Sequence, residues 1–366
     1  MIKLLTYNQI DPQQWSELIK SSPTATWFQT PEAYQFYAAN PEEMTPFALG
    51  VEEDGHLAGV IVGYTTQEKC IFKQYFTART IIPGGPLLAN CISETALAEL
   101  LNAVSQFKVE GLKFKGTENS VAETTASLPH RLIASSPHRL TKPIYVETRN
   151  FHDYSRWKEV FQKAGFAYQP HLNYHVDTTS LDQVQARIGK HRWRYIRLSM
   201  RDGAKIVDNP TIEQVRAFYT ILQELYRTKV KTPLWSWEFF ERLYHTEHAR
   251  YILVELDGQI VGGTVCVCLP GKAVYEWYAC GLDNCRDDIR PLSVAIWGEM
   301  QYAAENGYPL FDFMGAGTPN QPYGVRDFKA EFGGELVEHG RFLCVRKPLL
   351  YWIGKMGVKF LKSKRK

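Results

Sequence analysis

The stretch YILVELDGQIVGGTVCV, residues 251–267, has the pattern of a β-hairpin, with apolar runs on both sides of an Asp-Gly step. An Asp-Gly step between two apolar runs favours a tight turn, because this pair tolerates the positive φ angles that such a turn needs. The stretch FALGVEEDGHLAGVIVG, residues 47–63, repeats the same order of apolar, acidic, Asp-Gly and apolar-Gly positions. The two hairpins therefore predict an internal duplication of one structural unit.

The segments around each hairpin follow one order as well. Helical segments precede the hairpin, and a further strand, a helix and a short strand follow it. Helix starts are marked at Asp11, Thr30 and Thr211, where a capping side chain lies next to a proline. This order predicts the α/β (α+β) fold class, with two tandem domains of mostly antiparallel sheet flanked by helices. We place the domains at residues 1–145 and 146–345, with a C-terminal helix and basic tail at 346–366 and a divide within 116–150.

The composition is that of an ordinary globular protein of about two domains, with 366 residues, 45% hydrophobic and 22% charged. The sequence has no apolar run of transmembrane length and no secretory leader pattern, so we expect a cytoplasmic protein. The seven cysteines form no CxxC pair and the ten histidines no HExxH motif, so we expect neither a disulfide framework nor a metal site. Cys266 and Cys268 share one face of a strand and are expected to be buried thiols.

Five segments carry a family resemblance. They are WFQTPEAYQFY (27–37), IIPGGPLL (81–88), HRWRYIRLSMRDGAKIV (191–207), YPLFDFMGAG (308–317) and GVRDFKAEFGGELVE (324–338). Together they resemble the motifs of the Fem family (FemABX), whose members look like two GNAT acyltransferase units in tandem. The last segment is the most specific, because residue types and spacing agree across ten positions.

The resemblance implies a transferase that moves an amino acid from aminoacyl-tRNA to an amine of a peptidoglycan precursor, without a bound cofactor. Acetyl-CoA is a less expected donor, because Ile289 and Pro291 occupy the glycine positions of the GNAT pyrophosphate turn and Asp287 and Asp288 repel phosphate. Two alternatives stay open: a GNAT-type N-acyltransferase of polysaccharide or other envelope biosynthesis, and a binding protein without catalysis. Family members also keep a tryptophan and a phosphate-gripping lysine where this sequence has Ala33 and Tyr37.

The resemblance places Lys329, which follows Phe328, at the acyl centre, where its charge would stabilise an oxyanion. The alternative is a surface lysine. Asp312 and Asp327 are candidate acids or bases, and Asp312 could instead cap the loop that follows it. The substrate-binding candidates near the acceptor are Tyr226, Arg227, Phe328 and Tyr323.

Five cations recur at helical spacing within a long helix predicted over 180–200: Arg187, Lys190, Arg194, Arg197 and Arg201. On one helix they would line a single face and repel each other unless an anion lay across them. They are therefore candidates for contacts to the phosphates of tRNA or of a pyrophosphate-linked precursor. The alternative is a solvated face paired with acids. On the same helix Val184, Ile188, Tyr195 and Leu198 are predicted to face the core.

The C-terminal segment KPLLYWIGKMGVKFLKSKRK, residues 347–366, mixes large apolar residues with lysines. One hypothesis is peripheral contact with an anionic membrane surface, close to a lipid-linked substrate. The alternative, which we favour for its first half, is a helix packed on the protein with an exposed basic tail.

Overall fold

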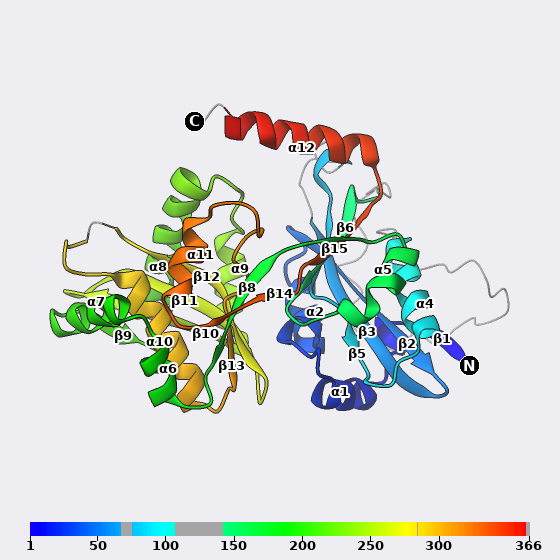
Figure 1. Ribbon diagram of the computed structural model, residues 1–366, viewed down its shortest axis with the longest axis horizontal. Helices are drawn as coiled ribbons and strands as arrows, with labels where there is room; N and C mark the ends of the chain where they lie inside the picture. The colour runs from blue at the N-terminus through cyan, green and yellow to red at the C-terminus, as the bar shows by residue number, and fades with distance from the viewer. Residues whose placement is uncertain (67–74, 107–141, 284, 364–366) are drawn as a thin grey trace.

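The computed structural model describes residues 1–66, 75–106, 142–283 and 285–363 (Figure 1). Two predictions lie outside these ranges: the short strand that ends the first repeat, which the sequence predicts at 112–115, and most of the divide within 116–150. The chain forms two lobes, each built on one sheet, and the C-terminal helix α12 (Pro348–Ser363) lies across one end of the molecule. None of the helices in the described ranges is both long and apolar enough to span a bilayer.

The first sheet has the strand order β1 (Ile2–Thr6), β2 (Met44–Glu53), β3 (His56–Thr66), β4 (Thr80–Gly84), β6 (Tyr145–Asn150), β15 (Arg341–Val345) and β7 (Ala167–Gln169), with β5 (Leu87–Leu88) beside β3. Its helices are α1 (Pro12–Ser21), α2 (Pro31–Ala38), α4 (Glu94–Ser105) and α5 (Lys158–Lys163). The side chains of Asp11 and Thr30 cap α1 and α2, as predicted.

The second sheet has the order β9 (Lys205–Val207), β10 (Ala249–Leu256), β11 (Gln259–Leu269), β12 (Ala273–Gly281), β13 (Leu310–Asp312), β8 (Leu172–Asp177) and β14 (Glu335–Glu338). Its helices are α6 (Leu181–Arg187), α7 (Lys190–Arg201), α8 (Ile212–Leu225), α9 (Trp237–Tyr244), α10 (Pro291–Glu305) and α11 (Gly324–Ala330). The side chain of Thr211 caps α8, as predicted.

The two sheets match position by position, which confirms the duplication. In each, the first four strands are antiparallel to their neighbours and the next pair, β4·β6 or β12·β13, is parallel. Both Asp-Gly hairpins have Asp at φ 51° followed by a glycine with positive φ. Each hairpin also has a bulge at the equivalent position, directly after the valine that lies three residues before the turn aspartate: Val51 in one and Val254 in the other.

A two-stranded ribbon joins the lobes. The register Ala167↔Leu343 in the first sheet continues without a shift into Leu172↔Glu338 and His175↔Glu335 in the second. As a result β15, from the end of the chain, is an interior strand of the first sheet, between β6 and β7. The first sheet thus draws strands from residues 145–169 and 341–345 as well as from the predicted range 1–145.

An aromatic core also crosses between the lobes. Trp27, Phe28 and Phe36 of the first lobe pack edge-on or tilted against Trp277, Tyr275 and Phe239 of the second, with ring centroids 5.0–6.0 Å apart. These side chains belong to one continuous buried cluster. The lobes therefore hold a fixed relative position, and the surface between them can form a defined site.

The long helix predicted over 180–200 is wrong. The backbone leaves the helix at Ile188 and Gly189, so α6 and α7 are separate and have different phases. Consequently Ile196 and Ser199 are buried in α7, while Tyr195, predicted to face the core, is 44% exposed. Gly189 donates its backbone N–H to the carbonyl of Glu331, 2.8 Å away, and so ties this break to the segment that follows α11.

Candidate active site

Strands β12 and β13 separate partway along the second sheet. They pair only from Ala273↔Leu310 to Tyr275↔Asp312, and β12 then continues to Gly281 without β13 beside it. A bulge places Trp277 between the paired residues Glu276 and Tyr278 of β12. In the first lobe β4 stays paired with β6 through its last residue, Gly84. An open wedge between the parallel strands is therefore a feature of the second lobe.

Lys329 lies in this wedge. Its Nζ donates to the carbonyl oxygens of Phe313 (2.7 Å) and Gly315 (3.1 Å) and lies 3.2 Å from Oε1 of Glu276 on β12. The side chains of Lys329 and Glu276 are only 11% and 5% exposed. The three ammonium hydrogens thus meet three acceptors, and Lys329 is not the surface lysine of the alternative interpretation.

Two buried carboxyls lie behind the lysine. Burial raises the pKa of Glu276, and the charge of Lys329 opposes that rise. Glu299, on α10, is fully buried, and burial together with the charge of Glu276 raises its pKa well above the usual range. With Glu299 neutral, Glu276 and Lys329 form a balanced pair, which fits their burial.

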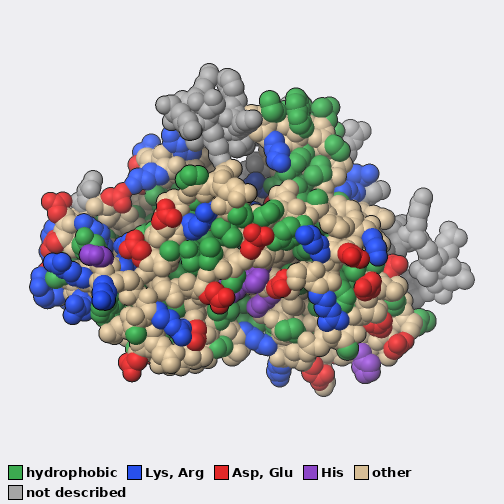
Figure 2. All heavy atoms as spheres, viewed as in Figure 1, with side chains coloured by type: hydrophobic (Ala, Val, Ile, Leu, Met, Phe, Trp, Pro, Cys, Tyr) green, Lys and Arg blue, Asp and Glu red, His purple; other side chains and the backbone are tan. Residues whose placement is uncertain are grey.

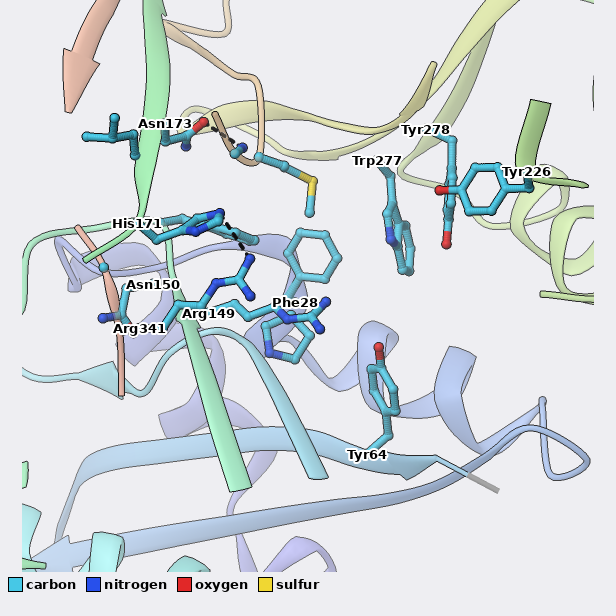
Figure 3. A pocket seen from close by; sticks show the side chains of 16 residues that line it. Phe28, Tyr64, Arg149, Asn150, His171, Asn173, Tyr226, Trp277, Tyr278 and Arg341 are labelled. Carbon is cyan, nitrogen blue, oxygen red and sulfur yellow. Dashed lines mark hydrogen bonds between the residues drawn. The ribbon is translucent and has the colours of Figure 1, made fainter. Parts of the chain in front are cut away.

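A pocket of about 230 Å³ opens between the lobes on one side of the wedge. Figure 3 shows Phe28 and Tyr64 of the first lobe facing Trp277, Tyr278 and Tyr226 of the second across this hollow. The ribbon supplies His171, Asn173 and Arg341, β6 supplies Arg149, and the turn after β13 supplies Met314 and Gly315. Because Gly315 is also an acceptor of Lys329, the ammonium lies directly behind the pocket wall.

The polar end of this pocket carries a net positive charge. Arg149 and Arg341 share the carboxylate of Glu147, at 2.8 and 3.3 Å. Burial opposes ionisation of Glu147, but these two guanidinium groups outweigh it and lower its pKa. His171 accepts from Arg341 at 3.0 Å, and burial, aided by Arg341, lowers its pKa to about 4, so it is neutral. Two cations then face one anion, an environment suited to an anionic ligand.

Asp312 lies beside the pocket and holds two of its lining residues, Asn173 and Met314, in place. It is fully buried and accepts hydrogen bonds from Asn173 (2.7 Å) and from the backbone of Met314 (2.5 Å). Its other oxygen lies 3.1 Å from Nε2 of His175. Burial lowers the pKa of His175, but the hydrogen bond and charge of Asp312 outweigh it and the net shift is upward. Asp312 is thus part of an Asp–His pair as well as a loop anchor.

A second hollow of about 460 Å³ lies at the start of α10. Phe328, the neighbour of Lys329, lines it together with Arg192, Asp287 and Arg290. Lys329 thus lies behind the wall of the first pocket, and its neighbour in sequence, Phe328, lines the second hollow.

The turn before α10 lacks the glycines and one of the backbone N–H groups that a GNAT pyrophosphate turn offers. Ile289 is fully buried and fills the turn, and Pro291 starts α10 without an N–H. Arg290 is bonded to the backbone carbonyls of Asp287 and Ile289. Asp287 adds a negative charge to the lining.

Comparisons with known proteins agree with this geometry. Residues 190–329 match the family described as Acetyltransferase (GNAT) domain. This match lies within the second lobe, and the repeated sheets give the chain two such units in tandem. The chain is an acyltransferase with a tandem GNAT fold.

Solved structures share its fold over almost the full length of the transferase. It is similar to FemX, at 15% identity and a TM-score of 0.67, covering 96% of this chain and 99% of that one. It is also similar to L-PGS from Bacillus licheniformis (13% identity, TM-score 0.51, 92% of both chains). A tandem GNAT protein from the clavulanic acid biosynthesis pathway gives 9% identity and a TM-score of 0.52, over 94% and 98%. A search of curated proteins finds no match.

The remaining predicted residues of the transferase are only partly brought together. Tyr226 lines the pocket and Phe328 the second hollow. Arg227 is exposed and paired with Glu224, and Asp327 is exposed on α11; neither lines the pocket or the second hollow. Tyr323 is 43% exposed and precedes α11.

The predicted cationic stripe of the transferase is broken by the helix break. Arg187, on α6, pairs with Asp177, and Arg201 pairs with Asp202. Lys190, Arg194 and Arg197 remain together on the exposed face of α7 and have no ion pair to any described residue. Figure 2 shows a group of Lys and Arg side chains at the edge of the molecule where Figure 1 places α7.

Arg192, which α7 turns inward, was not among the predicted site residues. Its guanidinium contacts Glu331 (3.1 Å) and Ser293 (2.7 Å) and lies over the ring of Phe328, 4.4 Å from its centroid. It was one arginine in an arginine-rich segment, and only the phase of α7 distinguishes it. In the first lobe Tyr37, at the family's lysine position, is fully buried and offers no phosphate contact.

Proposed function

We propose that the transferase moves an aminoacyl group from aminoacyl-tRNA to an amine of an anionic cell-wall precursor. The observation that carries the proposal is the position of Lys329, buried in the wedge directly behind the wall of the pocket between the lobes. The motif resemblance supplies the donor and acceptor classes, and the positive pocket between the lobes suits an acceptor that bears phosphate or carboxylate groups.

The reaction needs three things from the protein: a positive charge for the oxyanion, a base for the attacking amine and an acid for the leaving oxygen. The acceptor nitrogen attacks the ester carbonyl carbon, so a C–N bond forms and an electron pair moves onto the carbonyl oxygen. Lys329 stabilises this oxyanion by exchanging the Gly315 carbonyl for it. The intermediate then collapses, the ester C–O bond breaks, and the leaving hydroxyl takes a proton.

His175 is the proposed proton acceptor. When its Nε2–H donates to Asp312, the other ring nitrogen, Nδ1, is free to take the proton from the attacking amine and return it to the leaving oxygen. The pair is close to the wedge, because Asp312 directly precedes Phe313, whose carbonyl accepts from Lys329. His175 follows the pocket residue Asn173 on the same face of β8.

A donor competition tests this function. The protein is incubated with an amine-bearing cell-wall precursor, a mixture of charged tRNAs and a set of CoA thioesters, and each donor is assayed for loss of its acyl group. We expect deacylation of a charged tRNA that depends on the acceptor, and no consumption of thioester. Calorimetry with acetyl-CoA should give a dissociation constant weaker than micromolar, on the order of 1 mM.

Consumption of a thioester would instead support N-acylation in polysaccharide or other envelope biosynthesis. If no donor were consumed while the acceptor still bound, the chain would be a binding protein. Lys329→Met is the control for background hydrolysis, since it removes only the charge at the wedge.

The free cations of α7 predict a salt-dependent contact with tRNA. Arg194→Glu with Arg197→Glu should weaken tRNA binding and reduce the slope of log K against log salt by about 0.7–0.9 for each lost phosphate contact. The matched control is Arg156→Glu, since Arg156 is also exposed but lies over Trp157 in the first lobe. A slope unchanged in the double variant would show that this face is merely solvated.

A further inference from the structure

The C-terminal helix α12 exposes a row of large apolar side chains. Leu349, Trp352, Ile353 and Met356 are 69, 60, 50 and 49% exposed. Their spacing of three, one and three residues places them on one face of the helix. Figure 2 shows hydrophobic side chains gathered at the end of the molecule where Figure 1 places α12. The expectation that this half of the segment packs on the protein is therefore wrong for these side chains.

The helix is nevertheless held in a defined place. The ring of Tyr351, on another side of α12, packs edge-on against Tyr145 of β6, with centroids 5.8 Å apart. Lys347, just before α12, donates to the carbonyl of Tyr75 at 3.2 Å and lies over its ring. Tyr75 and Phe76 are each 46% exposed, so a second segment adds aromatic surface beside the start of the helix. We call Leu349, Trp352, Ile353, Met356, Tyr75 and Phe76 the apolar face.

The charges of the C-terminal segment have one sign. From residue 346 to the end the sequence contains no Asp or Glu, and its cations are Arg346, Lys347, Lys355, Lys359, Lys362, Lys364, Arg365 and Lys366. A second copy of the chain would bring an equally basic segment against this one, without acids to compensate it. An apolar stripe bordered by lysines is instead complementary to a surface that is apolar inside and anionic outside.

We propose that the apolar face docks the transferase on a bilayer rich in anionic lipid. The apolar side chains enter the boundary between headgroups and acyl chains, and the cations lie among the headgroup phosphates. At 16 residues, α12 is too short to cross a bilayer, so it lies along the surface. The proposal concerns a part of the molecule separate from the wedge and does not depend on which acyl group is transferred.

Vesicle sedimentation of the full chain tests the proposal. The wild type should sediment with vesicles of three parts phosphatidylglycerol to one part phosphatidylcholine, and much less with pure phosphatidylcholine. Trp352→Ser with Ile353→Ser should weaken binding by on the order of tenfold to a hundredfold, because two buried side chains are lost. Lys347→Glu with Lys355→Glu should weaken binding most at low salt.

Two controls keep the test specific. Met356→Ser should weaken binding, whereas Met200→Ser, an equally simple change at a 40% exposed methionine of α7, should not. Arg194→Glu with Arg197→Glu should leave vesicle binding intact, which excludes the other basic surface. Failure of the wild type to sediment with anionic vesicles would overturn the proposal. So would a dimer in light scattering that the Trp352/Ile353 variant converts to monomer.

Discussion

Lys329→Met is expected to lower kcat by about a hundred- to a thousandfold, the usual cost of losing one oxyanion donor. Methionine fills a similar length but removes the charge that Glu276 and the carbonyls of Phe313 and Gly315 now share. The chemical step should therefore slow while acceptor affinity stays nearly constant. Single-turnover kinetics at saturating acceptor measures that step directly.

Two other kinetic results for Lys329→Met would contradict this role of Lys329. If Lys329 only gripped the acceptor, the substitution would raise KM and spare kcat. Lys329→Met also leaves the carboxylate of Glu276 buried without its partner. Glu276→Gln with Lys329→Met is therefore the matched control for stability, since it leaves no unpaired carboxylate. Lys329→Arg should restore activity only in part, because a guanidinium places its donors differently. An unchanged chemical step in Lys329→Met would remove the residue from the mechanism.

Asp312→Asn should lower kcat by on the order of a hundred- to ten-thousandfold with little change in shape. The new side chain can still accept from Asn173 and Met314 through its oxygen. Its amide, however, donates to Nε2 of His175, which fixes the proton on Nδ1 and blocks that nitrogen as a base. The residual activity should come from the charge of Lys329 alone.

The pH profile separates catalysis from loop anchoring. In the wild type the pKa of His175 is raised, so the rate should increase as pH rises through that raised value and the base becomes neutral. Without the Asp312 charge the pKa falls, and any residual limb should move to lower pH. Other titratable groups facing His175 are His152, His339 and Glu335.

Asp177→Asn, at an exposed acid on the same strand, is the control and should leave the pH profile unchanged. A parallel loss of activity with no shift would mean that Asp312 only anchors the turn.

Local chemistry explains what the sequence could predict. The two Asp-Gly steps predicted both hairpins and the duplication, because this pair fits the positive φ that the turns require. The same holds for the caps at Asp11, Thr30 and Thr211, where a side chain acts on backbone three residues away. Lys329 was predicted from a motif that contains glycines, and the fold requires glycine at one of these positions. A Cβ on Gly333 would lie 2.3 Å from the carbonyl oxygen of Arg187, so the backbone must pass there without a side chain.

Long-range pairing explains what the sequence could not predict. The break at Gly189 depends on a hydrogen bond to Glu331, and it alone turns Arg192 inward and Arg194 outward. Likewise, whether Arg187 is free depends on Asp177 of β8, whose position beside α6 follows from the fold. The partner of Arg201 is its neighbour in the chain, Asp202. The pocket between the lobes was missed for the same reason, since its residues come from strands far apart in the chain.

The ribbon between the lobes has a consequence for the order in which the protein can be made. Domains usually fold from the N-terminus as synthesis proceeds. Here β15, residues 341–345, occupies an interior place in the first sheet, and β7 reaches that sheet only by pairing with it. The first lobe therefore cannot reach its final structure until residues 341–345 have left the ribosome. Until then the edge of β6 that β15 will cover is unpaired and can pair with a strand of another chain.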